Sequence, residues 1–283
     1  MAVLVFGKTG QVATELARVG GDDVVCLGRA EADLADPDAC AAIIRDTDAT
    51  GVINAAAYTA VDKAEDEEAL ATVINGDAPA AMARAAAERG LPFVHISTDY
   101  VFDGSGAKPW LPEDETAPLG AYGRSKLAGE RGVVAAGGTF AILRTSWVFS
   151  SHGSNFVKTM LRLAETKDHL TIVEDQIGGP TEAGDIARAC LAVARGLSGA
   201  TGQGGIYHFS GRPDVSWADF AREIFAQADL KVSVEGIPAS AYPTKAKRPG
   251  NSRMDCSSLQ ASFGVTRPDW RESLGRVLAD LST

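Results

Sequence analysis

Cysteine and histidine are scarce in this chain, and neither residue type is grouped. The 283 residues include four cysteines and four histidines. They form no Cys-x-x-Cys pair and show no metal-ligand spacing, which argues against a disulfide framework or a zinc site and suits a reducing compartment. The residues concerned are Cys26, Cys40, Cys190, Cys256, His95, His152, His169 and His208. We expect His95, which falls within a predicted strand, to be packed in the interior.

Positive charge and long apolar runs are also lacking. Lysine and arginine total 27 against 37 acidic residues, so the formal net charge is −10. No cluster of basic residues stands out, which argues against nucleic acid or an anionic membrane as the main partner. No run approaches the length of a membrane span, and the start "MAVLVFGKTG" has no basic leader. We therefore expect a soluble, cytoplasmic protein without a membrane partner.

Short β-rich runs alternate with longer helical patterns in the first half of the chain. This order predicts right-handed crossovers and a parallel sheet with helices on both faces, a Rossmann-like, doubly wound α/β fold. The predicted strands are Val3–Phe6, Val24–Leu27, Val52–Asn54, Phe93–Ser97 and Phe140–Arg144, and the predicted helices are Gln11–Val19, Asp36–Arg45, Asp77–Arg89 and Tyr122–Ala135.

The rhythm changes after about Ser146, where segments rich in glycine and proline separate the elements. We predict a dinucleotide-binding domain over 1–146 and a smaller, mainly substrate-binding lobe over 147–283, and leave open that late elements return to the first sheet. The predicted later elements are helices Asn155–Glu165, Asp185–Ala194 and Trp217–Ala228 and strands Thr171–Val173 and Ile206–Phe209.

The stretch "VLVFGKTGQVA" places Gly7 directly after the first strand and Gly10 at the start of the next helix. Glycines there permit a tight turn and let backbone N–H groups approach a pyrophosphate, and Ala13 is small enough for close helix–strand packing. A strand-to-helix turn that merely needs glycine is the alternative. The position on the first βα turn of an alternating pattern favours a dinucleotide site.

The end of the second strand bears on which dinucleotide binds. NAD-binding proteins usually carry an acid there, whereas this chain has Gly28 and Arg29. A guanidinium at that point can hold the 2′-phosphate of NADP. Because Glu31 lies close by, NADPH is favoured and NADH is left open.

Tyr122 and Lys126 lie four residues apart on a predicted helix, so both side chains can point at one place. A nearby ammonium lowers the pKa of a phenol, which can then give its proton to a carbonyl oxygen. Ser97 and Thr98 end the fourth strand and can hydrogen-bond the same oxygen. Taken singly, these features also fit a solvated helix face and a capped turn.

The motifs "GKTGQVA", "NAAAYTAVDKAE", "STDYVFDG", "YGRSKLAGE" and "RTSWVF" resemble those of extended short-chain dehydrogenase/reductases. "STDYVF", "RTSWVF" and "RPGNSR" narrow the resemblance to the dTDP-4-dehydrorhamnose reductases, and it covers essentially the whole chain. This resemblance implies NADPH-dependent reduction of the C4 keto group of dTDP-4-dehydrorhamnose to dTDP-L-rhamnose. Two alternatives stay open: another nucleotide-linked 4-keto-6-deoxysugar, or a non-catalytic role such as that of the regulatory subunit of methionine adenosyltransferase.

The resemblance also implies roles for single residues. Tyr122 would donate the proton, Lys126 would hold the nicotinamide ribose and tune Tyr122, and Thr98 would polarise the carbonyl. With the patterns above, the expected cofactor contacts are Gly7, Thr9, Gly10, Gln11, Val12, Arg29, Asp33, Leu34, Ala57, Tyr58, Thr59, Tyr122 and Lys126. The expected substrate contacts are Thr98, Asp99, Trp147, Arg248 and Asn251, the last two at the nucleotide diphosphate.

Some members of this family are dimers bridged by magnesium through several glutamates. Glu15 is present here, but Gly184 stands where another of those acids is expected. We therefore expect no metal ligands and regard a magnesium bridge as doubtful, while a homodimer is left open.

Overall fold

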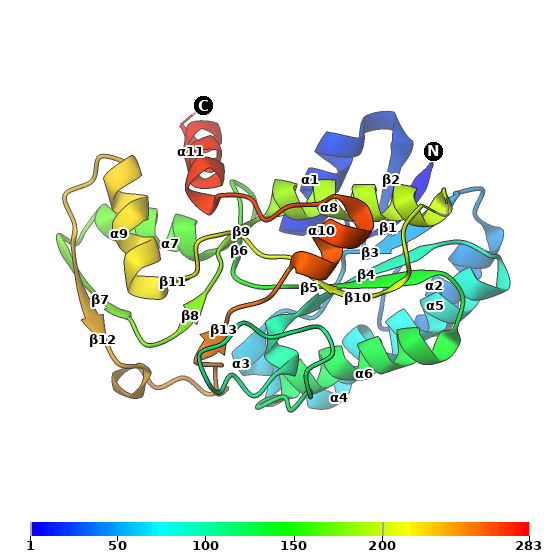
Figure 1. Ribbon diagram of the computed structural model, residues 1–283, viewed down its shortest axis with the longest axis horizontal. Helices are drawn as coiled ribbons and strands as arrows, with labels where there is room; N and C mark the ends of the chain where they lie inside the picture. Colours follow the sequence, from blue (N-terminus) through cyan, green and yellow to red (C-terminus); the bar gives the residue numbers. More distant parts are fainter. Residues whose placement is uncertain (1, 200, 283) are drawn as a thin grey trace.

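A six-stranded parallel sheet forms the centre of the computed structural model, which describes residues 2–199 and 201–282 (Figure 1). Its strand order is β10-β5-β4-β3-β1-β2. The winding direction therefore changes between β1 and β3, which is where open α/β sheets bind ligands. The strands are β1 (Val3–Phe6), β2 (Val24–Leu27), β3 (Gly51–Asn54), β4 (Phe93–Thr98), β5 (Phe140–Thr145) and β10 (Gly205–His208). The predicted doubly wound α/β fold is confirmed.

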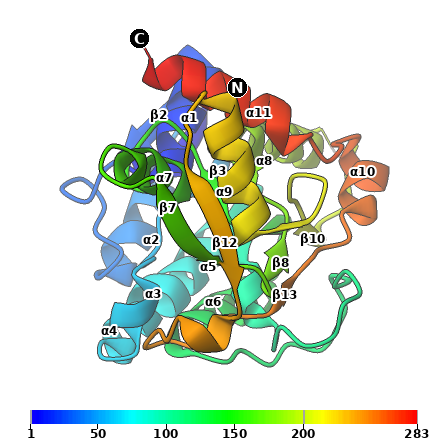
Figure 2. The ribbon, with the colours of Figure 1, turned by 90° about the vertical axis from the view of Figure 1, so that its left-hand side faces the viewer.

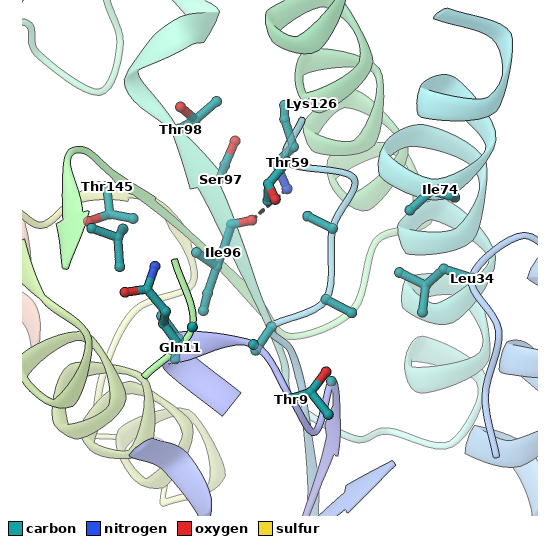
Figure 3. Close-up of a pocket in the computed structure, with 18 of the residues that line it drawn as sticks. Thr9, Gln11, Leu34, Thr59, Ile74, Ile96, Ser97, Thr98, Lys126 and Thr145 are labelled. Atoms are coloured by element: carbon teal, nitrogen blue, oxygen red, sulfur yellow. Dashed lines mark hydrogen bonds between the residues drawn. The ribbon is translucent and has the colours of Figure 1, made fainter. Parts of the chain in front are cut away.

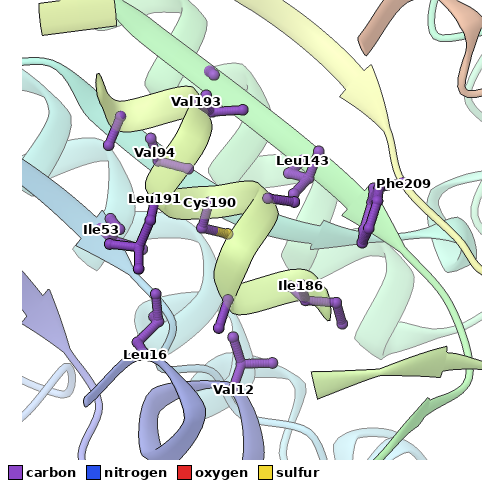
Figure 4. Packing of buried hydrophobic residues seen from close by; sticks show 14 of the residues in the cluster. Val12, Leu16, Ile53, Val94, Leu143, Ile186, Cys190, Leu191, Val193 and Phe209 are labelled. Atoms are coloured by element: carbon purple, nitrogen blue, oxygen red, sulfur yellow. The ribbon is translucent and has the colours of Figure 1, made fainter. Parts of the chain in front are cut away.

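Helices cover both faces of this sheet. On one face α1 (Gln11–Gly20) and α8 (Ala183–Ser198) pack against the strands, and Figure 4 shows Ile186 and Cys190 of α8 with Leu143 of β5 in this core. On the other face lie α2 (Pro37–Asp46), α5 (Ala78–Glu88) and α6 (Ala121–Ala136). Burial on both sides explains why the strands read as continuous apolar runs.

Helix α6 is held unusually close to the segment that precedes α5. That segment contains α3 (Val61–Ala64), α4 (Glu68–Thr72) and a π-helical turn, η2 (Val73–Asp77). A Cβ on Gly129 of α6 would lie 2.1 Å from the carbonyl oxygen of Asn75, and one on Gly132 would lie 2.4 Å from Cβ of Ala80. Only glycine fits at such distances, so these two glycines determine how near α6 approaches η2 and α5.

A smaller lobe is built from the later part of the chain (Figure 2). Its core joins aromatic and aliphatic residues of three helices to a two-stranded parallel sheet of β7 and β12. The elements are α7 (Phe156–Ala164), α9 (Trp217–Gln227), α11 (Trp270–Leu281), β7 (His169–Val173) and β12 (Ser233–Ile237). Shorter strands are β6 (Val148–Phe149), β8 (Ile177–Gly178), β9 (Thr181–Glu182), β11 (Val215–Ser216) and β13 (Asn251–Ser252), and α10 (Ser257–Phe263) packs near α8.

Two later elements belong to the first layer rather than to the smaller lobe. Strand β10 pairs in parallel with β5, and α8 contributes many residues to the core on one face of the main sheet. The chain therefore returns to the first layer with the continuous segment that runs from α8 to β10. No helix of the described residues is long and apolar enough to cross a membrane.

Candidate active site

A cavity of about 750 Å³ opens at the carboxyl edge of the central strands, beside the point where the winding changes (Figure 3). The loop after β1, the ends of β2 and β4, the segment after β3 and the start of α6 all line it. Residues 145–148 and 153–154 complete the wall. Both lobes thus contribute residues to one cavity.

The glycine-rich loop forms one wall. Gly7 has a φ of +115°, and a Cβ there would lie 3.3 Å from the backbone of Ala55 and Ala56, so a side chain is strongly disfavoured. Gly10 caps α1 with nothing within 4 Å of a built Cβ. In the described part of the chain no side chain caps α1, and its first turn holds no acid. The free N–H groups and the helix dipole therefore suit a pyrophosphate, so this loop fits a dinucleotide.

Charged side chains of both signs lie where the loop after β1 meets the end of β2. Arg29 is 80% exposed, and its Nε lies 4.0 Å from Oδ1 of Asp33. Lys8 lies 3.4 Å from Glu31, whose other carboxylate oxygen accepts a 2.6 Å hydrogen bond from the N–H of Gly28. Glu31 is thus engaged by its own loop, and Lys8 and Arg29 both line the cavity. Two cations at this point suit a phosphate better than an uncharged ribose.

Tyr122, Thr98 and Lys126 all line this cavity, as the sequence predicts. The hydroxyl of Thr98 acts on the phenol of Tyr122 and lowers its pKa. Thr98 Oγ1 also donates to Oδ1 of Asp99 at 3.0 Å and accepts from the N–H of Tyr100 at 3.2 Å. Nζ of Lys126 donates to the carbonyl oxygen of Ile96 at 2.7 Å, the dashed line in Figure 3.

Burial displaces the pKa of each ionisable group here toward its neutral form. It raises the pKa of Tyr122 well above its usual value, and the hydrogen bond with Thr98 opposes that shift. It lowers the pKa of Lys126 to about 8 and raises the pKa of Asp99 to about 6. At neutral pH the phenol of Tyr122 therefore keeps its proton.

That Lys126 lowers the pKa of Tyr122 stays a prediction. The described groups that act on the phenol besides burial are Thr98, which lowers its pKa, and Asp99 and Tyr100, which raise it. Nζ of Lys126 instead contacts Ile96 and His95 on β4. The ammonium is thus hydrogen-bonded to strand β4.

A buried ion pair anchors the helix that carries Tyr122 and Lys126. Arg144 of β5 makes two hydrogen bonds to Glu130 of α6, at 2.9 and 2.7 Å, and both side chains are 2% exposed. Ser97 of β4 donates to the same carboxylate at 2.5 Å, and β-sheet register places Ser97 opposite Arg144. Breaking such a pair is costly because one buried charge is left uncompensated. Sequence reasoning gave Glu130 and Arg144 no role, although both lie within the quoted motifs.

Comparison with known proteins identifies the family to which this chain belongs. The model of the RmlD substrate binding domain matches residues 1–283. A dTDP-4-dehydrorhamnose reductase of Sinorhizobium fredii is 46% identical, covering 98% of this chain and 97% of its own. The chain belongs to the RmlD family.

Solved structures of the same kind agree with this assignment. The crystal structure of a dTDP-4-dehydrorhamnose reductase from Clostridium acetobutylicum superposes with a TM-score of 0.94 at 36% identity, covering 100% of both chains. One from Bacillus anthracis, in complex with NADP, has a TM-score of 0.92 at 32% identity and covers 99% of this chain and 100% of its own. The expected resemblance is therefore confirmed.

Most of the residues expected at the ligands of this RmlD-family chain do line the cavity. On the cofactor side these are Gly7, Thr9, Gly10, Gln11, Val12, Arg29, Asp33, Leu34, Ala57, Thr59, Tyr122 and Lys126, and on the substrate side Thr98, Asp99 and Trp147. Tyr58 is not among the lining residues, and its hydroxyl donates to Glu67 at 2.8 Å. Their contacts with ligands stay predictions.

Trp147 lines the cavity in an unusual backbone conformation. Its φ is +50°, and its ring stacks on that of Trp217 with centroids 3.5 Å apart. A Cβ on Gly178 would lie 2.9 Å from the same ring, so Gly178 leaves room for it. The stacked ring of Trp217 and the space left at Gly178 thus fix the position of the Trp147 ring.

Arg248 and Asn251 lie outside the residues that line the cavity. Asn251 is 2% exposed, and its amide nitrogen donates to the carbonyls of Ser105 and Lys108 at 3.2 and 2.8 Å. Contact with a diphosphate would require those bonds to break. Arg248 donates to Asp62 at 2.9 Å and is partly exposed, so its side chain can exchange this partner for an anion.

The surroundings of Glu15 explain the glycine at position 184. A Cβ on Gly184 would lie 2.8 Å from carboxylate oxygens of both Glu15 and Glu182. Glu15 is also bound by Arg18 at 2.6 Å and by His152 at 2.9 Å. A larger residue at position 184 would therefore require both carboxylates to move.

Sequence reasoning missed several lining residues because their identity carries no chemical signal. They are Leu27, Gly28, Ala32, Ala55, Ala56, Val61, Ile74, Ile96, Tyr100, Thr145, Ser146, Val148, Gly153 and Ser154, together with Lys8. Lys8 could have been predicted, because it is a cation inside the quoted glycine loop.

Proposed function

We propose that this protein reduces the C4 keto group of dTDP-4-dehydrorhamnose with NADPH to give dTDP-L-rhamnose. The observation that carries the proposal is the meeting of Tyr122, Thr98 and Lys126 in a cavity that begins at the uncapped N-terminus of α1. The relatives of the RmlD family that bear this activity in their names match over nearly the full length of both chains.

The residues of the centre divide the work as follows. Tyr122, whose raised pKa keeps it protonated, donates a proton to the carbonyl oxygen. Thr98 turns its hydroxyl from Asp99 to the same oxygen and stabilises the charge that develops there. NADPH supplies the hydride. Trp147 offers a flat apolar face to the sugar ring, and Lys126 holds the nicotinamide ribose.

The choice of NADPH over NADH rests on charge. Lys8 and Arg29 stand at the end of the cavity formed by β2, where the 2′-phosphate of a bound cofactor would lie. Glu31, the acid that would favour NADH, already binds the N–H of Gly28 and the ammonium of Lys8. We therefore expect NADPH to be preferred, with slower reaction from NADH.

The test follows nicotinamide absorbance while the purified protein meets the keto sugar, generated in place by its epimerase. Tyr122→Phe removes the proton donor, so turnover should fall by roughly 10²–10⁴-fold with cofactor binding retained. Tyr242→Phe is the matched control, because Tyr242 is 62% exposed and lies outside the cavity.

NADPH oxidation that yields dTDP-L-rhamnose and disappears in Tyr122→Phe supports the proposal. Oxidation with other nucleotide-linked keto sugars but not with this one would assign a different substrate to the same centre. Cofactor binding without any turnover would reject the enzyme and favour a regulatory subunit.

A further inference from the structure

The segment before β13 carries three cations, and two of them are paired with acids at α3. The cations are Lys245, Lys247 and Arg248. Nη2 of Arg248 donates to Oδ2 of Asp62 at 2.9 Å, and Nζ of Lys245 donates to Asp66. The two acids precede these partners by 186 and 179 residues, so only the fold brings the pairs together. The proposed function gives Asp62 no role.

The guanidinium of Arg248 lies one side chain away from the cavity. Its Nη1 lies 3.4 Å from the hydroxyl of Tyr100, which lines the cavity. The ring of Tyr100 packs edge-on against that of Tyr122, with centroids 5.5 Å apart. Val61, which directly precedes Asp62, also lines the cavity. A ligand held beside Tyr122 is therefore close to this ion pair.

The side chain of Arg248 can leave Asp62 while the backbone around it stays in place. Oδ1 of Asp62 accepts a hydrogen bond from the N–H of Ala246 at 3.0 Å, and Ala246 is 1% exposed. On the other side of Arg248, a Cβ on Gly104 would lie 2.4 Å from Pro249, so the two backbones are closely packed. Rotation of the guanidinium alone is thus enough to change its partner.

The ion pair is one that a phosphate group can displace. The side chains of Arg248 and Asp62 are 32% and 47% exposed, and a pair so accessible to solvent is weak. Only Nη2 donates to the carboxylate, whereas a phosphate can accept from two nitrogens of the guanidinium at once. A diphosphate also carries more negative charge than one carboxylate. It therefore competes well with Asp62 for Arg248.

We propose that Asp62 is an internal counter-anion, which holds Arg248 while the site is empty and gives it up to the diphosphate of a bound nucleotide sugar. The proposal rests on the proposed function, in which substrate and product are both linked to dTDP. Because carboxylate and diphosphate compete for one guanidinium, Asp62 weakens the binding of both ligands. Differences of this kind lie mostly in the dissociation rate, so Asp62 favours release of the product.

The first test needs no sugar and no turnover. dTDP, the part that substrate and product share, is titrated by calorimetry into the wild type and Asp62→Asn. Asparagine keeps an oxygen for the N–H of Ala246 but loses the charge. We expect dTDP to bind Asp62→Asn about two- to fivefold more tightly, the range set by an exposed ion pair. Equal or weaker binding would overturn the proposal, because a carboxylate that only oriented Arg248 would strengthen binding.

Arg248→Gln tests the same exchange from the other side. Loss of the guanidinium should weaken dTDP binding by about tenfold or more. In that background Asp62→Asn should have no further effect on the dTDP affinity, since the two residues act through one contact. An unchanged dTDP affinity in Arg248→Gln would overturn the proposal, and this result decides the matter if Asp62→Asn does not fold.

Controls separate this exchange from a general effect of charge. Glu88→Gln removes one negative charge from an exposed ion pair with Arg45, and neither residue lines the cavity. Its dTDP affinity should equal that of the wild type, and tightening as large as in Asp62→Asn would reject the proposal. Thymidine, which has no phosphate, and NADPH, which has its own pyrophosphate, should bind Asp62→Asn and the wild type equally. A shift for NADPH but not for dTDP would assign Arg248 to the cofactor and overturn the proposal.

Turnover separates this inference from the proposed function. If the protein reduces the keto sugar, KM for that substrate should fall in Asp62→Asn in parallel with the dTDP dissociation constant, while kcat does not rise. A structural defect would instead lower kcat without tightening the binding of dTDP. Tighter dTDP binding in a protein that reduces no keto sugar would reject the function and leave the role of Asp62 intact. Turnover with an unchanged dTDP affinity would do the reverse.

Discussion

At the scale of single residues, the cavity shifts its ionisable groups toward neutrality. Tyr122 and Asp99 have raised pKa values and Lys126 a lowered one, with burial as the largest cause in each case. When such a buried group carries a charge, it lowers the stability of the folded protein, because water would solvate that charge better than the interior does. These groups lie where proton transfer is proposed. The packing around the site, and not attraction between its own charged groups, therefore keeps these side chains in place.

Asp99 provides a test of that cost. Burial raises the pKa of its carboxyl from 3.8 to about 6, so the folded state binds the proton more tightly than the unfolded state. Stability is therefore lost as the pH rises from about 4 to about 6, and the full penalty persists above that range. Asp99→Asn should be more stable than the wild type at pH 7.5 by on the order of 2 kcal/mol, with the difference fading toward pH 4.

Thermal melting at pH 7.5 and pH 4.5 measures this effect. Asp103→Asn is the control, because Asp103 is exposed and its pKa is lowered by hydrogen bonds from Ser105, so its removal should not stabilise the protein. If Asp99→Asn melts at a lower temperature than the wild type at pH 7.5, the prediction is wrong. The neighbours of Asp99 would then stabilise its carboxylate in the folded protein.

At the scale of elements, helix α6 carries the proposed chemistry, and close packing decides where it lies. Its glycines let it approach η2 and α5, and the pair of Glu130 and Arg144 ties it to β5. Both features belong to one helix, while their partners lie on other elements of the fold. The position of Tyr122 and Lys126 follows from these contacts rather than from helix propensity.

Gly129→Ala tests this packing. The added Cβ would lie 2.1 Å from the carbonyl oxygen of Asn75, so α6 or η2 must move. We expect a destabilisation of about 1–3 kcal/mol in spite of the better helix propensity of alanine. Gly275→Ala in α11 is the matched control, since its nearest atom, Oε1 of Gln227, lies at 3.4 Å and can give way. Equal melting temperatures for the two variants would contradict the prediction.

At the scale of the whole molecule, the two lobes share one cavity, and the chain passes between them more than once. Residues 145–148 and 153–154 line the same cavity as the glycine loop. Gln11 accepts hydrogen bonds from Ser150 and Asn155 at 2.8 and 2.9 Å, which joins that loop to the start of α7. Ligand binding should therefore stabilise both lobes together.

The predicted boundary at residue 146 can be tested with a fragment. Residues 1–146 would lack α8 and β10, which leaves one face of the sheet and the edge of β5 uncovered. We expect the fragment to bind a hydrophobic dye and to show no cooperative thermal transition, in contrast to the full chain. A fragment that unfolds cooperatively and binds NADPH would show that the first domain is independent.

Much of the first layer could be predicted from local pattern. The bounds of β1 and β2 agree with the prediction, because both strands are short apolar runs closed by glycine. The helix predicted over Asp77–Arg89 appears as α5, beginning at Ala78 after a π-helical turn that no periodicity indicates. The short strands β6, β8, β9, β11 and β13 were missed, since two residues are too few for a pattern.

By itself the sequence determined the parallel α/β layer, the family, the glycine loop after the first strand and the choice of Thr98, Tyr122 and Lys126 as candidate site residues, because each depends on local spacing or on a quoted motif. Only the tertiary structure decided what those residues touch. Nζ of Lys126 contacts His95 and Ile96, and Asn251 is hydrogen-bonded to a loop far away in the sequence. Hydrogen bonds and burial depend on how close residues lie in space. The order of residues along the chain does not give that distance.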